Sequence, residues 1–141
     1  MSYSGIKRIA QDAISANQGE TTGDKMIVGF KRPATILGFG LIVAAAYGAE
    51  TTNMVVALDH DPASGARVEK ATITIPDNAP LGAVYEASEL QRGRNPVSPN
   101  AVMDAFDVAE GDLVIVEVTT ANSAGAGEPL FYVLVAPKGS L

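Results

Sequence analysis

Short apolar segments alternate with turn-forming residues along most of the chain. Gly, Pro, Asn and Asp are concentrated between these segments, and no long helical pattern occurs after residue 25. Short strands with this spacing are typical of antiparallel architectures. We therefore predict an all-β fold, an antiparallel β-sandwich or jelly roll. The seven expected strands lie within residues 26–30, 34–47, 53–59, 67–76, 82–87, 113–118 and 130–136.

The expected strands differ in how many apolar faces they present. Polar and apolar side chains alternate in 67–76, which predicts one wet face and one buried face that carries Ala71, Ile73 and Ile75. Segments 113–118 and 130–135 are apolar on nearly both faces. A second apolar face needs cover. We expect the N-terminal segment or a neighbouring subunit to provide it.

The longest run of low polarity, residues 36–49, is expected to be a buried strand. It spans 14 residues and contains Gly38, Gly40 and Gly48. A membrane-spanning helix needs roughly 20 apolar residues. Glycine inside a strand indicates a bulge or a close approach of another backbone, which we expect at Gly38 and Gly40.

The N-terminal segment differs from the rest of the chain. Its apolar residues follow a helical spacing, which predicts a short amphipathic helix, and an extended arm is the alternative: Ile6, Ile9, Ala10, Ala13 and Ile14. Residues 17–24 are polar and contain glycine, as linkers do. We therefore divide the chain into an arm or short helix over 1–24 and a sandwich domain over 25–141. No secretory apolar region follows Lys7 and Arg8, so we expect no export signal.

Composition limits the partners. The chain has 141 residues, of which 47% are hydrophobic and 18% charged, so one domain has more apolar surface than average to bury. Some of that surplus is expected to meet another chain. The net charge is −6 and the basic residues are scattered, which argues against a nucleic-acid partner, and we expect no membrane partner. The absence of cysteine excludes disulfides and thiol catalysis.

Two acidic stretches are the candidates for chemistry. His60, the only histidine, lies between Asp59 and Asp61, which could bind a hard cation or be solvated turn residues. Residues 104–112 contain four carboxylates that could bind a metal or serve a hydrolase through Asp107 or Glu110. The alternative is a turn at 110–112 that leads into the strand at Leu113. No nucleophile elbow, phosphate loop or dinucleotide motif occurs, so we expect no catalytic residue, metal or cofactor.

Three longer segments carry a resemblance to a known family. They are residues 36–65, 68–87 and 106–135, and their most distinctive parts are ATITIP at 71–76 and GDLVIVEVTTA at 111–121. A loop of small residues and an apolar strand follow the second of these. In this order the segments resemble the capsid decoration, or cement, proteins of tailed bacteriophages.

The resemblance implies a structural protein with a β-sandwich or jelly-roll fold. Such a protein would be made in the host cytoplasm, bind the exterior of an assembled phage head and bridge subunits of the major capsid protein. It would also bind its own copies, as trimers or alternatively dimers. The candidate capsid or subunit contacts are Ile6, Ile9, Ile14, Arg92, Arg94, Asn122 and Ser123.

Two other classes of function stay open at the level of sequence. The first is a different virion component, such as a tail or fibre module, or a glycan-binding sandwich. A glycan site would have to use Tyr132 with Asp59 and Asp61. The second is the small hydrolase based on the 104–112 carboxylates.

Overall fold

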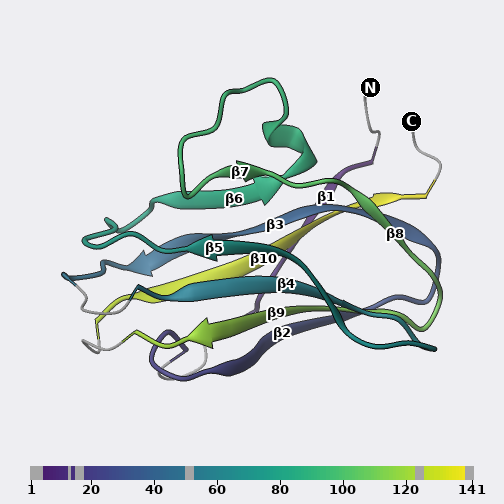
Figure 1. Cartoon of the computed structure of the whole chain (residues 1–141), viewed down its shortest axis with the longest axis horizontal. Helices are drawn as coiled ribbons and strands as arrows, with labels where there is room; N and C mark the ends of the chain where they lie inside the picture. Colours follow the sequence, from purple (N-terminus) through teal and green to yellow (C-terminus); the bar gives the residue numbers. More distant parts are fainter. Residues whose placement is uncertain (1–4, 13, 15–17, 50–52, 123–125, 139–141) are drawn as a thin grey trace.

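The protein is an all-β sandwich. The computed structural model describes residues 5–12, 14, 18–49, 53–122 and 126–138. These residues form ten strands and one 3-10 helix, and the strands make two packed sheets (Figure 1). The predicted fold class is therefore confirmed.

Each predicted apolar segment contains one strand, and three further short strands were not expected. The predicted strands are β2 (Gly23–Gly29), β3 (Ala34–Ala45), β4 (Val55–Asp61), β5 (Val68–Thr74), β6 (Val84–Ser88), β9 (Leu113–Thr120) and β10 (Glu128–Pro137). The unexpected elements are β1 (Lys7–Ala10), the 3-10 helix η1 (Glu89–Gln91), β7 (Ala101–Val102) and β8 (Phe106–Val108).

The order of the strands is that of a jelly roll. The larger sheet, sheet A, has the order β1-β10-β3-β6-β7, and β8 also pairs with β3. The smaller sheet, sheet B, has the order β2-β9-β4-β5. Without the short β7 and β8, the first strand pairs with the last and the second with the last but one, as in a jelly roll. All pairs are antiparallel except β6 with β7.

The core lies between the two sheets and is built from alternate residues of their strands. Along β5 and the residue that follows it, Ile73 and Ile75 are buried while Lys70, Thr72 and Thr74 are exposed, which confirms the predicted alternation. Truncating one large core side chain to alanine typically costs about 3–5 kcal/mol. The fully buried core residues include Ile36, Phe39, Leu41, Val56, Leu58, Val116 and Phe131.

The outer face of β10 is covered mainly by the segment around η1. Tyr132 and Leu134 are buried there with Leu37, and Leu90 and Ala105 pack against them. The N-terminal segment contributes only in part, because the Arg8 guanidinium lies 4.3 Å from the centre of the Tyr132 ring. The expected cover by the N-terminal segment is therefore confirmed only in part, and cover by a neighbouring subunit stays a prediction.

The N-terminal segment contains a strand of sheet A, so the predicted short helix is wrong for residues 7–10. β1 pairs with β10, with Lys7 opposite Val135 and Ala10 opposite Tyr132. Ile9 points inward and packs against the core. The segment is part of the sandwich, and the expected boundary at residue 24 falls inside β2.

Two glutamines fasten the chain as it passes from sheet A to sheet B. The side chains of Gln11 and Gln18 exchange hydrogen bonds of 3.0 and 2.8 Å. Gln18 Nε2 also donates to the carbonyl of Pro129, and Gln11 Nε2 donates to the carbonyl of Lys25. Gln18 is fully buried, so these bonds satisfy groups that have lost contact with water.

The glycines of β3 are required by close neighbours, as predicted. A Cβ on Gly40 would lie 2.4 Å from the Tyr132 hydroxyl and 2.6 Å from the Tyr85 carbonyl oxygen. A Cβ on Gly38 would lie 2.3 Å from the Ala87 carbonyl oxygen. The register between β3 and β10 also shifts between Leu134 and Val135, which places a bulge at the same level.

Candidate functional site

The predicted contact residues lie in separate regions rather than on one surface. Ile6 precedes β1 and is exposed, whereas Ile9 is partly buried against the core. Figure 1 shows that the segment from η1 to β7, which carries Arg92 and Arg94, projects at the top, whereas the β9–β10 connection lies at the lower left. Ile14 is half-buried. Ser123 lies outside the described residues.

Asn122 has a structural role in the β9–β10 connection. Its side chain is buried, and its Nδ2 donates to the carbonyl of Ala126. Its backbone N–H donates to the carbonyl of Gly19 at 2.9 Å. These bonds join the β9–β10 connection to the N-terminal segment, so the Asn122 side chain is not presented to a partner.

Both arginines of the η1–β7 loop are exposed, and Arg92 is also paired with acidic side chains of the same chain. Arg92 forms ion pairs with Glu89 at 2.6 Å and Asp104 at 2.7 Å. The hydrogen bond from Arg92 lowers the pKa of Glu89. Arg94 is exposed, and Val97 in the same loop is 77% exposed. Arg94 and Val97 are therefore two exposed side chains of this loop that a partner can contact.

An apolar row crosses the outer face of sheet A. Leu130 on β10 lies opposite Ile42 on β3, and Ile42 lies opposite Val84 on β6. Their side chains point away from the core, because Leu130 alternates with Phe131 and shares its face with Tyr132. Val84 is 46% exposed, and Leu130 and Ile42 are half-buried. We call these three residues the outer apolar row.

A polar cluster around Glu86 borders the outer apolar row. Glu86 accepts hydrogen bonds from the Tyr132 hydroxyl at 2.6 Å, from Ser88 Oγ at 2.7 Å and from Gln91 Nε2 at 3.0 Å. Burial and this carboxylate raise the pKa of Tyr132. The Glu86 backbone N–H donates to Asn100 Oδ1, so the cluster joins sheet A to the η1–β7 loop. The outer apolar row is thus held on a rigid support.

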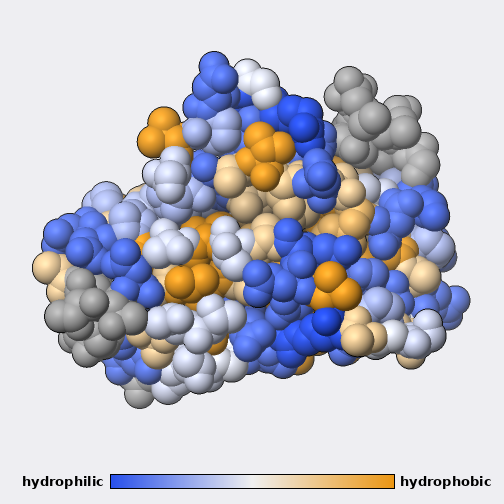
Figure 2. Space-filling model, in the orientation of Figure 1, coloured by the Kyte–Doolittle hydropathy of each residue, from blue (hydrophilic) through white to orange (hydrophobic). Residues whose placement is uncertain are grey.

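Exposed apolar side chains also occur away from sheet A. Figure 2 shows one face of the molecule, where hydrophilic residues surround several separate apolar patches. Ile27 on β2 is 58% exposed and Val68 at the start of β5 is 46% exposed. Single exposed apolar residues are normal on soluble proteins. Three apolar residues that lie opposite one another on neighbouring strands, as in the outer apolar row of sheet A, are more distinctive than single exposed residues.

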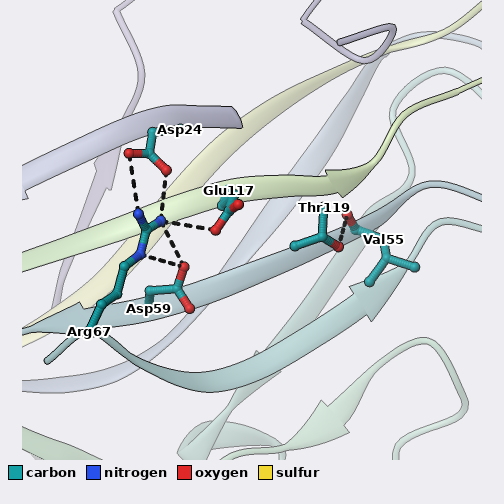
Figure 3. A network of polar contacts seen from close by, with 6 residues as sticks. All are labelled: Asp24, Val55, Asp59, Arg67, Glu117 and Thr119. Carbon is teal, nitrogen blue, oxygen red and sulfur yellow. Dashed lines mark hydrogen bonds and ion pairs between the residues drawn. The ribbon is translucent and has the colours of Figure 1, made fainter. Parts of the chain in front are cut away.

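The outer face of sheet B carries a charge network centred on Arg67 (Figure 3). Arg67 Nε donates to Asp59, and Nη2 donates to Asp24 at 2.7 Å and Glu117 at 3.0 Å. The hydrogen bond with Asp24 is the largest cause that raises the pKa of Arg67, and burial raises the pKa of Glu117. Because the carboxylates lie on β2, β4 and β9, Arg67 joins the four strands of the sheet.

His60 is paired with Asp112 at one end of sheet B. His60 Nε2 lies 3.0 Å from Asp112 Oδ2, and its ring packs against Phe106. Asp112 also accepts hydrogen bonds from the backbone N–H groups of Ala109 and Ala63, and these three contacts lower its pKa to about 2. The pair ties the β8–β9 turn to the β4–β5 turn.

The structure corrects the prediction for residues 59–61. Asp59 is buried beside Arg67, and His60 lies within β4 instead of in a solvated turn. Among the residues that the structure describes, no three side chains of His, Cys, Asp or Glu are grouped so as to hold a metal ion. Asp59 and Asp61, the two acidic residues proposed for a cation, have different positions. Asp59 pairs with Arg67, and Asp61 is the last residue of β4.

The other candidate acids are also engaged with different partners. Asp104 pairs with Arg92, and Asp107 accepts a 2.8 Å hydrogen bond from Thr35. Glu110 is exposed in the predicted turn before β9. Tyr132, the aromatic residue that a glycan site would need, is buried. Asp104, Asp107 and Tyr132 are thus engaged within the fold, whereas Glu110 is exposed to solvent.

Comparison of the chain with protein-family models, with curated proteins and with solved structures finds no match. Within the described part of the chain, no helix has the length and apolar character to cross a bilayer. We therefore infer the function from the exposed residues of this chain itself.

Proposed function

We propose that this protein is a structural component of a phage head that binds the exterior of the assembled shell and stabilises it. The outer apolar row is the observation that carries the proposal. It is formed by Leu130, Ile42 and Val84 on neighbouring strands and is only partly covered. The resemblance of the sequence to phage decoration proteins gives the class of partner.

The physical mechanism requires binding without chemistry. Burying the exposed part of the outer apolar row against a capsid subunit or a second copy removes apolar surface from water, at about 25 cal/mol per Å². A protein that binds the assembled shell and not its separated parts stabilises the shell by RT ln(1 + [L]/Kd) per site. Many equivalent sites on one particle multiply this effect.

The sheet A surface is suited to such a contact because it is rigid. The Glu86 cluster fixes Tyr132 and the η1–β7 loop beside the row, so little conformational entropy is lost when a partner binds. Arg94 and Val97 project from the same loop and can contact the partner at the edge of the interface.

The proposal is tested by placing a charge in the outer apolar row. We expect Val84→Lys to reduce the amount of this chain on purified particles at least tenfold, because a lysine would have to be buried in the contact. Val68→Lys is the matched control, since Val68 is the same residue type and equally exposed, at 46%, on sheet B. Both variants should keep the thermal unfolding temperature of the unmodified protein within a few degrees.

The result is read from the ratio of this chain to the major capsid protein. Retention of Val84→Lys at the level of the unmodified chain would remove the outer apolar row from the interface. An equal loss of both variants would show that the added charge acts without regard to position, which would also contradict the proposal.

A further inference from the structure

A second surface lies at the open side of the sandwich, between the edge strands of the two sheets. β1 ends sheet A and β2 ends sheet B, and each pairs with only one other strand among the described residues. A groove of about 500 Å³ opens between them, next to the loop that joins β2 to β3. We call it the edge groove. Its lining includes Lys7, Ile9, Val28, Phe30, Lys31 and Arg32.

The floor of the edge groove is apolar and continuous with the core. Ile9, Val28 and Phe30 are partly buried and pack against the core residues, and Val135 belongs to the core itself. These side chains are accessible because no further strand closes the sandwich between β1 and β2 in the part of the chain that the structure describes. An apolar side chain inserted there would be removed from water on most sides.

The rim of the edge groove is basic, although the whole protein has a net charge of −6. It carries Lys7 from β1 and Lys31 and Arg32 from the β2–β3 loop. None of these three takes part in the ion pairs found among the described residues, unlike Arg67 and Arg92. Unpaired positive charges beside an apolar floor suit a ligand that combines carboxylates with apolar groups.

We propose that the edge groove binds an extended acidic segment of a partner protein. The free edges of β1 and β2 offer backbone groups to an added strand, and the alternate side chains of that strand can enter the floor or reach the basic rim. The volume is within the usual range for a binding site. Cations contributed by two separate elements match several carboxylates along a peptide better than the single carboxylate of a fatty acid.

This proposal does not depend on the phage-head function, because it concerns a different side of the molecule. Near Lys25 the free edge of β2 is already occupied, because Gln11 Nε2 donates to the carbonyl of Lys25. The groove is therefore limited to the other end of β2. The groove is therefore long enough for a few residues only. A short peptide is a suitable probe.

The test is a titration of the full chain with a fluorescein-labelled peptide of alternating Glu and Val, six residues long, followed by fluorescence anisotropy. We expect saturable binding that weakens as the salt concentration rises. Arg32→Glu should weaken binding at least tenfold, and Lys31→Glu should act in the same direction. Arg94→Glu is the matched control, because Arg94 is exposed in a distant loop and the change in net charge is the same; it should alter binding less than twofold.

Each of the following results would overturn the proposal that the edge groove binds an acidic segment. Equal binding of a peptide of alternating Lys and Val, or equal weakening by Arg32→Glu and Arg94→Glu, would overturn the charge-specific groove. Complete displacement of the acidic peptide by decanoate at equal concentration would replace the peptide with a lipid-like carboxylate as the occupant. Self-association of the unmodified protein that Arg32→Glu abolishes would make a second copy the occupant, and would also overturn the proposal.

Discussion

At the scale of single residues, Asp112 joins two turns through one carboxylate. It accepts two backbone hydrogen bonds, from Ala109 and Ala63, and lies 3.0 Å from His60. All three contacts favour the charged form, which explains the pKa of about 2. A carboxylate whose pKa is lowered in the folded state stabilises the fold above the pKa of the unfolded chain.

The pH dependence of stability follows from this carboxylate. The contribution of Asp112 should be complete above about pH 4, the usual range of an aspartate, and should be lost as the pH falls through about 2. In urea unfolding between pH 7 and pH 2, we expect Asp112→Asn to be less stable than the unmodified chain at pH 7 and to lose less stability on acidification. Parallel pH curves for the two proteins would contradict this assignment.

Gly40 gives a second test at the residue scale. A Cβ at this position would lie 2.4 Å from the Tyr132 hydroxyl, within a packed and hydrogen-bonded cluster. We expect Gly40→Ala to lower the free energy of unfolding by about 1–3 kcal/mol, as overpacking does. Gly48→Ala is the control, because nothing lies within 4 Å of its added Cβ, and its unfolding free energy should stay unchanged or rise slightly.

At the scale of elements, Arg67 connects the strands of sheet B. Its partners Asp24, Asp59 and Glu117 come from three different strands, and Asp59 is buried. Replacing Arg67 by methionine leaves these carboxylates without their cation. We expect Arg67→Met to cost about 1–3 kcal/mol at pH 7.

The cost of Arg67→Met should shrink at acidic pH, because burial raises the pKa of Glu117, and protonation of this carboxyl removes its repulsion from the neighbouring acids. Chemical unfolding at pH 7 and pH 4 measures the difference. Arg94→Met, a change at an exposed arginine, should stay within about 0.5 kcal/mol at both values. A cost for Arg67→Met that does not change with pH would show that the arginine acts through packing of its methylene groups instead of its charge.

The seven long strands were predictable because each is a segment of dense or alternating apolar residues bounded by turn residues. β1 was not, since Ile6 and Ile9 fit a helical spacing and the strand forms only because β10 offers a free edge. The cover of the β10 outer face was also missed. It depends on Leu90, an isolated apolar residue in a polar segment, and on Ala105, and their position is set by tertiary contacts.

The surfaces proposed for binding were beyond prediction from sequence for a similar reason. The outer apolar row requires the register that places Leu130 opposite Ile42 and Ile42 opposite Val84. The edge groove requires Lys7 on β1 and Arg32 in the β2–β3 loop to line the same groove. Of the predicted contact residues, Arg94 is exposed, whereas Asn122 is buried and Ile9 packs against the core.

At the scale of the whole molecule, the jelly roll separates three surfaces. The outer face of sheet A carries the outer apolar row, sheet B carries the Arg67 network, and the open side between β1 and β2 carries the basic groove. A protein that contacts both a shell and a further partner could use the first and third surfaces at once. The ion pairs that Arg67 forms with other residues of sheet B would keep the sandwich rigid during both contacts.

The central claim is that the protein covers an assembled phage head in many copies. Quantitative peptide mass spectrometry of purified particles from the source measures it most directly, as the ratio of this chain to the major capsid subunit. We predict a ratio that corresponds to hundreds of copies per particle. A handful of copies per particle, or none, would contradict the proposal that the protein decorates the phage head.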